Sequence, residues 1–144
     1  MKISTVRFGE IEIEEERIFK FALPIIGFDE LTNYVILDIN KDSFFKWLQS
    51  VEDPALAFPI VSVFSMNIDY SIDLSDDVVE SLKINSVENL LVMNIASIPQ
   101  NNPQGTTLNL LAPIIFNLEE CIAGQVILTG SGYDISFPLF KTVN

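Results

Sequence analysis

Histidine is absent from this 144-residue sequence, and cysteine occurs once, at Cys121. Without histidine, the chain cannot build a Ser-His-Asp or Cys-His catalytic arrangement or a metal site that contains histidine. A single cysteine cannot form an internal disulfide, which fits a reducing compartment. We interpret Cys121 as a packing residue, because free cysteine is among the residues most often buried.

Basic residues are also scarce: eight lysines and arginines stand against twenty acidic residues, which leaves a formal net charge of −12. From Trp47 onward, eleven acidic residues accompany only Lys83 and Lys141. Direct binding to nucleic acid is therefore not expected, because phosphate contacts need Lys and Arg. The acidic excess has two interpretations, namely that it keeps the protein soluble or that it attracts a basic partner.

Long apolar runs and a targeting segment are missing as well. Residues 89–118 carry no charge, but prolines and amides at 97–107 break this stretch, so no run reaches the ~20 apolar residues of a membrane span. The first eight residues, MKISTVRF, are interrupted by polar side chains and lack the apolar stretch of a signal peptide. We therefore expect a cytoplasmic protein that does not bind membranes.

Motifs for phosphates and metals are not recognisable either. TGSGYD (129–134) has two glycines but neither a G-x-G-x-x-G pattern nor a Walker-type lysine. DLSDD (73–77) resembles the start of a calcium loop, yet Val78 stands where such loops need glycine, so helix capping is the preferred interpretation. A glycosidase-type carboxylate pair is left open by the sequence. We predict no enzymatic activity, no cofactor and no metal site.

Hydrophobic residues make up 49% of the chain, which is typical of a folded core. Short β-prone segments alternate with turn residues from the beginning to the end of the chain. The clearest are 34–39, 43–53, 56–64, 90–98, 106–117, 125–130 and 133–140. The pattern predicts one domain over residues 1–144, mainly β, as a small antiparallel barrel or sandwich with one short helix near residues 75–84.

That helix has a recognisable beginning. Ser75 is a typical N-cap residue, and Asp76 and Asp77 place negative charge in the first turn, where it suits the helix dipole. Leu74 and Val79 have the spacing of a hydrophobic staple. DLSDDVVESLKI (73–84) is therefore the one segment that we expect to be helical.

Prolines occur inside or at the ends of three strand-like segments, at Pro59, Pro113 and Pro138. Proline has no N–H to donate to a neighbouring strand, so it belongs at edges, strand ends or bulges. In TTLNLLAPIIFN (106–117), Pro113 interrupts a segment that is otherwise suited to a sheet. We predict that Pro113 marks a point where a strand bends or leaves one neighbour.

Several segments together resemble the FliW family of flagellar assembly factors. They occur in family order and span nearly the whole chain, and VMNI and the T-x-N-L-x-A-P-I run are the most specific. The matching stretches are FGEIEI (8–13), LP..GF (23–28), LQSVEDPALAF (48–58), VMNIASI (92–98), TLNLLAPIIFN (107–117) and QVIL (125–128). The sequence departs from the family in one loop, where Ala22 replaces a glycine and two isoleucines separate Pro24 from Gly27.

The resemblance implies a regulatory binding protein. Members of this family bind flagellin in the cytoplasm, and they also bind CsrA, a basic RNA-binding dimer that represses translation of flagellin mRNA. When flagellin is exported, the freed family member captures CsrA and relieves the repression. A strongly negative protein would suit a basic partner and would repel RNA phosphates near the occupied surface.

Polar residues inside the family-typical segments are our candidate partner-binding residues. They are Gln49, Asp53, Asn94, Asn109 and Asn117. For the asparagines we favour the alternative of a structural role, because amides at bulges and strand ends usually bond to nearby backbone groups.

A second function also fits the composition. A small β-barrel could serve as a ligand-binding or chaperone module for peptides or small molecules.

Overall fold

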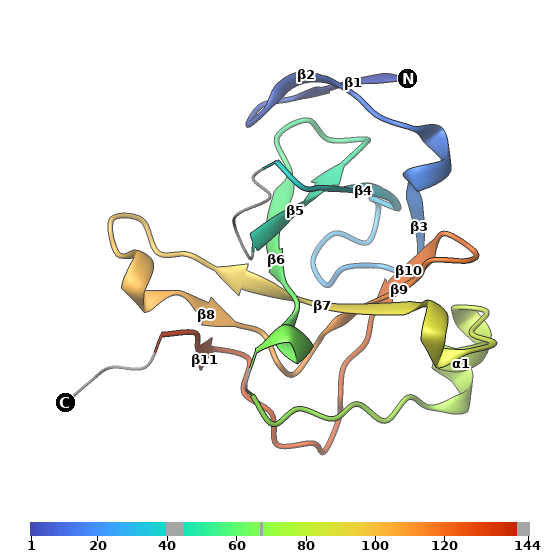
Figure 1. Ribbon diagram of the computed structural model, residues 1–144, viewed down its shortest axis with the longest axis vertical. Coiled ribbons are helices and arrows are strands. Elements are labelled where there is room, and N and C mark those ends of the chain that lie inside the picture. The colour runs from blue at the N-terminus through green and yellow to red at the C-terminus, as the bar shows by residue number, and fades with distance from the viewer. Residues whose placement is uncertain (40–44, 67, 141–144) are drawn as a thin grey trace.

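The computed structural model describes residues 1–39, 45–66 and 68–140, which form a closed β-barrel with a separate two-stranded hairpin above it (Figure 1). The strands are β1 (Lys2–Thr5), β2 (Gly9–Glu12), β3 (Phe19–Leu23), β4 (Asn33–Leu37), β5 (Phe45–Ser50), β6 (Ala57–Val61), β7 (Leu90–Ser97), β8 (Thr107–Leu108), β9 (Ile114–Asn117), β10 (Ile122–Gln125) and β11 (Phe137–Pro138). The helical elements are α1 (Asp76–Ser81) and the 3-10 turns η1 (Glu15–Arg17), η2 (Val63–Ser65), η3 (Val87–Asn89) and η4 (Pro103–Gly105). The predicted fold class, mainly β with one short helix, is confirmed.

The barrel closes because β7 pairs with both β6 and β9. Around the ring the strand order is β7-β6-β5-β4-β3-β10-β9, and β9 returns to β7. A closed ring with an odd number of strands cannot alternate direction at every step, so one neighbouring pair must be parallel. That pair is β3 and β10, with Ile122 opposite Lys20, whereas the other pairings in the ring are antiparallel.

The position of β10 corrects the sequence-based strand at 125–130. The strand is Ile122–Gln125, so it overlaps the predicted range only at Gln125. Small residues allow the close approach of β3 here, since a Cβ on Gly124 would lie 2.7 Å from the Cβ of Leu23. The sequence pattern missed the strand because Ala123 and Gly124 have low β propensity. Small residues fit here because the backbones of β10 and β3 lie close together.

The barrel interior is aromatic. Phe116 is fully buried, and its ring lies 4.9 Å from that of Phe19, while the rings of Phe21 and Tyr34 are 4.7 Å apart. A second cluster covers the outside of the wall near β7 and β9 and includes Ile115 and Leu82. Because this wall has apolar residues on both faces, β7 begins with four consecutive apolar residues (90–93) instead of alternating apolar and polar ones.

Pro113 lies at a bulge where the segment after β8 leaves β7 and returns to it as β9. The N–H of Asn109 donates to the carbonyl of Ile95 (3.0 Å), and pairing resumes with Ile114 opposite Met93. Asn94 therefore stands opposite the four residues 110–113. The prediction for Pro113 is confirmed, and its carbonyl accepts a hydrogen bond from the N–H of Val126 (2.9 Å).

Pro59 lies in β6, which has neighbours on both sides and is not an edge strand. In an antiparallel pair of strands, hydrogen-bonded and non-hydrogen-bonded residue pairs alternate. The hydrogen bond from Ser50 N–H to Leu56 O (2.9 Å) marks one hydrogen-bonded pair, and counting along the register from it makes Trp47 and Pro59 a non-hydrogen-bonded pair. On its other side, β6 pairs with β7 only from Ile60. A proline is tolerated because neither neighbour needs its missing N–H.

Helix α1 begins as the sequence predicts. The Ser75 hydroxyl accepts a hydrogen bond from the N–H of Val78 (3.3 Å). The helix ends earlier than residue 84, because Lys83 adopts a positive φ of 53°. The N–H of Lys83 donates to Glu80 O and the N–H of Ile84 donates to Val79 O, which is the Schellman pattern of helix termination.

We expect the variant Tyr34→Phe to keep a free energy of unfolding within about 1 kcal/mol of wild type at neutral pH. The ring packing would persist, and the Tyr34 hydroxyl bonds to none of the described residues. Burial, aided by the negative charges of Glu52 and Asp53, raises the pKa of Tyr34 to about 12.

An unfolded tyrosine ionises near pH 10, so Tyr34 contributes stability that is present below pH 10 and is lost as the pH rises towards 12. Tyr34→Phe should therefore lose less stability than wild type between about pH 8 and about pH 11, measured by urea unfolding. Equal losses in the two proteins would contradict this assignment.

Candidate functional site

The predicted partner-binding residues do not form one site. Hydrogen bonds join Gln49 to Asp53 (3.4 Å) and Asn94 to Asn109 (2.8 Å), and none within the described residues links these two pairs to each other or to Asn117. Gln49 and Asp53 belong to β5 and the turn after it, Asn94 and Asn109 face each other across the bulge, and Asn117 ends β9. Each side chain bonds to backbone groups close to it. The structure therefore shows what these residues do within the barrel wall, and contact with a partner stays a prediction.

Gln49 holds the β5–β6 turn from inside. Its side chain is fully buried, and its amide nitrogen donates to the carbonyls of Ser50 (3.0 Å) and Leu56 (3.1 Å). In the same turn, a carboxylate oxygen of Asp53 accepts a hydrogen bond from Ala55 N–H (3.0 Å). A fully buried amide offers a partner no surface, so the geometry favours a structural role for Gln49.

Asn94 holds the bulge in the same manner. Its side chain is fully buried and donates to the carbonyl of Asn109 (2.8 Å) and to the hydroxyl of Tyr70 (3.2 Å). The Asn109 side chain accepts a hydrogen bond from Ala112 N–H (3.0 Å), and Gln125 donates to the carbonyl of Ala112 (3.1 Å) from the other side. These amides replace the ladder bonds that the bulge interrupts.

Asn117 connects the barrel to α1. Its amide nitrogen donates to the carbonyls of Leu82 (2.8 Å) and Lys83 (2.9 Å), where the helix ends, and its oxygen accepts from the N–H of Glu119 (3.2 Å). The orphan carbonyls of a helix C-terminus are thereby satisfied by a buried side chain. The structural interpretation of the asparagines agrees with these bonds.

Cys121 packs against the barrel cluster and is half-buried, with a positive φ of 53°. Its thiol donates to the carbonyl of Glu16 (3.1 Å).

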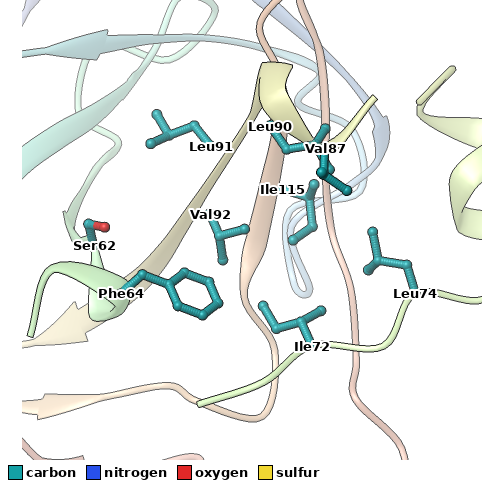
Figure 2. Close-up of a pocket in the computed structure, with 9 residues that line it drawn as sticks. All are labelled: Ser62, Phe64, Ile72, Leu74, Val87, Leu90, Leu91, Val92 and Ile115. Carbon is teal, nitrogen blue, oxygen red and sulfur yellow. The ribbon is translucent and has the colours of Figure 1, made fainter. Parts of the chain in front are cut away.

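An apolar groove of about 390 Å³ lies outside the barrel, over the outer faces of β7 and β9. Figure 2 shows the side chains of Phe64, Ile72 and Val92 pointing toward one another across it. Phe64 comes from η2, Ile72 from the segment that leads to α1, and Val92 from β7. The full lining is Ser62, Phe64, Ile72, Leu74, Val87, Leu90, Leu91, Val92 and Ile115.

Tyrosines fix the wall of this groove that precedes α1. The Tyr70 hydroxyl donates to the carbonyl of Leu110, and burial raises the pKa of Tyr70, which keeps this hydroxyl protonated. The Tyr133 hydroxyl accepts from Ser71 N–H (2.8 Å) and donates to Ser71 O (3.1 Å). The rings of Tyr70 and Tyr133 lie 4.7 Å apart. The segment that carries Ile72 is therefore attached to the barrel at two adjacent residues.

Two exposed carboxylates adjoin groove residues along the chain. Residues 68–140 carry nine, all exposed, and Lys83 is the one basic residue in that range. The ion pairs found among the described residues lie in the first part of the chain: Met1–Glu12, Lys2–Glu10, Arg17–Glu14 and Lys46–Asp38. Asp73 lies between two groove residues and Glu88 follows Val87, and we call Asp73 and Glu88 the acidic rim.

The described residues contain neither a metal-binding cluster nor a membrane-spanning helix. Within residues 1–39, 45–66 and 68–140, no group of three or more His, Cys, Asp or Glu side chains is placed to hold a metal ion. The DLSDD segment begins a helix, as the hydrogen bond to Ser75 shows. In the part of the chain that the structure describes, no helix has the length and apolar character needed to cross a bilayer.

Sequence reasoning missed the groove residues. The sequence predicts a strand that ends at Phe64 and assigns no element to Val87, although Phe64 is 52% exposed and Val87 is 81% exposed. One signal was available, because Ile72-Asp73-Leu74 alternates apolar and acidic residues outside any strand. Only the fold shows that Phe64 and Val87 line the same groove.

Comparisons with known proteins give one consistent result. A family model described as "FliW protein" matches residues 2–139. A protein of Clostridium tetani described as "Flagellar assembly factor FliW" is 35% identical over 144 residues, which is 100% of this chain and 99% of the relative. A protein of Syntrophus aciditrophicus with the same description is 40% identical over 141 residues, covering 98% of this chain and 89% of that protein.

A solved structure described as "Crystal structure of the flagellar assembly factor FliW" has the same fold. It superposes with a TM-score of 0.91 at 37% identity, and the match covers 99% of both chains.

We expect Asn117→Ala to lower the free energy of unfolding by about 1–3 kcal/mol, because it leaves buried carbonyls at the end of α1 without donors. Urea unfolding followed by fluorescence would measure the change. Asn85→Ala is the matched control, since Asn85 is exposed and follows the same helix. Equal stability of both variants would contradict the role given to Asn117.

Proposed function

The chain belongs to the FliW family, and from this premise we propose that it is a flagellar assembly factor that binds flagellin and the translational regulator CsrA in the cytoplasm. Flagellin occupies the protein while it accumulates. When flagellin is exported, the freed protein captures CsrA and relieves the repression of flagellin mRNA. Partner switching couples synthesis to export in this scheme.

The charge of the surface is the observation that carries the CsrA half of this proposal. Nine exposed carboxylates in residues 68–140 are accompanied by Lys83 alone, and ion pairs within the described residues leave all nine unneutralised. Such a surface attracts a basic protein and steers its approach. It also places negative charge next to the bound regulator, which raises the free energy of RNA binding there.

A binding role also suits the groove. Eight of its nine lining side chains are apolar, and Ser62 is the exception. The rim residues Asp73 and Glu88 are exposed to water instead of being enclosed with a reactive group. The relatives described above are named assembly factors, and no reaction forms part of that description.

A ligand-binding or chaperone module for peptides or small molecules is the second candidate function. The apolar groove of about 390 Å³ favours it, since small-molecule sites begin at roughly this volume. The two functions differ in a binding experiment, because a ligand module would retain neither CsrA nor flagellin.

Titration of the purified protein with purified CsrA should give a stoichiometric complex, and flagellin added afterwards should displace CsrA. Isothermal titration calorimetry and size-exclusion chromatography would measure both steps. An RNA oligonucleotide carrying the CsrA site should be released when the protein is added. Retention of neither partner would reject the proposal in favour of the ligand module.

The rate of association with CsrA should fall at least about tenfold between about 0.05 M and about 0.5 M NaCl, because salt screens the carboxylates that steer the encounter. The dissociation rate should change less. Stopped-flow fluorescence would resolve the two rates. An association rate that is indifferent to salt would remove electrostatic steering from the proposal.

A further inference from the structure

We propose that the apolar groove and its acidic rim form a docking site for an amphipathic basic segment of a protein partner. The apolar side chains of the segment would fill the groove, and flanking lysines or arginines would face Asp73 and Glu88. The inference rests on the proposed function in that a protein partner binds, and it adds the place of binding and the chemistry of the bound segment.

Two apolar side chains of the groove are unusually exposed. Single exposed apolar side chains are normal on a protein surface and need no explanation. Phe64 and Val87, however, are 52% and 81% exposed and line the same groove, together with Ile72 and Val92 (Figure 2). Because these side chains are grouped in one groove, a single bound segment could bury all of them together.

The shape and chemistry favour a protein segment over a small molecule. A small-molecule site encloses most of its ligand and provides a few convergent polar groups that orient it. Here two lining side chains are more than half exposed, and Ser62 is the one polar residue of the lining. An open apolar groove is the usual receptor for the apolar face of an amphipathic helix.

The charges around the groove select the polar part of the segment. Asp73 adjoins Ile72 and Leu74, and Glu88 adjoins Val87, so the carboxylates follow groove residues directly along the chain. Both are exposed, and no ion pair among the described residues neutralises either of them. Basic residues beside the apolar face would gain attraction there, and acidic residues would be repelled.

A second copy of the chain is a poor occupant by the same reasoning. Its net charge of −12 would oppose a like charge across the interface.

The groove also needs little ordering before it binds, because Tyr70 and Tyr133 already hold the wall that carries Ile72. A rigid receptor loses less conformational entropy on binding, which favours a segment that itself orders on docking.

The first test uses model peptides. One is an amphipathic helix with leucine on one face and lysine on the other, and its partner has glutamate in place of lysine. Fluorescence anisotropy should show at least about tenfold tighter binding of the lysine peptide. Equal affinities for the two peptides would overturn the proposed charge selection.

The second test removes the groove surface without adding charge. The double variant Phe64→Ser and Val87→Ser should weaken binding of the lysine peptide at least about tenfold. Val6→Ser with Ile26→Ser is the matched control, since these residues are 75% and 57% exposed and do not line the groove. Thermal melting would reveal whether the Phe64 change affects folding. If it does, Val87→Ser alone, at the most exposed lining residue, is the variant in which weaker binding of the lysine peptide is expected.

The third test examines the acidic rim. Asp73→Asn with Glu88→Gln should weaken binding and reduce its salt dependence, whereas Glu15→Gln with Glu30→Gln, which removes two exposed charges elsewhere, should leave both unchanged. Loss of affinity with both pairs would show that only the overall charge matters and would overturn the role of the rim.

The natural partners separate this inference from the proposed function. The groove variant should lose affinity for purified CsrA, for purified flagellin or for both, while the matched control retains it. If the wild type binds a partner and the groove variant binds it equally well, the groove inference is wrong and the proposed function stands. If the wild type binds neither but still selects the lysine peptide through the groove, the proposed function is wrong and the inference stands. A wild-type dimer that the groove variant abolishes, seen by size-exclusion chromatography, would assign the groove to a second copy and overturn the inference.

Discussion

A buried amide spans the point at which the barrel closes. β7 must pair with β8 at one end and with β9 at the other, and the chain between them bulges by several residues at the change of neighbour. Asn94 stands at that point and bonds across the gap to the carbonyl of Asn109 and to Tyr70. Because unpaired backbone groups inside a protein cost several kcal/mol together, the bulge persists only with such bonds. The opposite side is held in the same way by Gln125.

The position of the apolar groove follows from this closure. The hydroxyl of Tyr70 accepts a hydrogen bond from the Asn94 side-chain amide, and Tyr70 also anchors the segment ahead of α1. The side chain of Asn117 anchors the end of α1 to β9. These attachments place Ile72 over the outer faces of β7 and β9. The next residue along the chain, Asp73, is exposed and forms no ion pair within the described residues. Buried amides of the family-typical segments therefore help to shape the groove indirectly, by holding the segments beside it.

Particular residues show how far sequence reasoning reached. The beginning of α1 was predictable because the Ser75 cap depends on residues within one turn, and the break at Pro113 was predictable because proline cannot donate in a ladder. Strand β10 was missed because Ala123 and Gly124 are poor strand formers. They occur there because β3 packs closely against them, and the local sequence contains no sign of that contact. The groove was missed for the same reason, since Phe64 and Val87 are distant in the chain and meet only after folding.

The amino-acid sequence by itself determined the acidic charge, the absence of histidine chemistry, the mainly β composition and the family resemblance, because composition and short motifs are properties of the chain alone. The tertiary structure decided which polar residues support the wall and which apolar residues remain at the surface. An asparagine has the same sequence signal whether it bonds to a partner or to its own backbone. Only the closed barrel, with its odd number of strands and its single parallel pair, fixes where each side chain points.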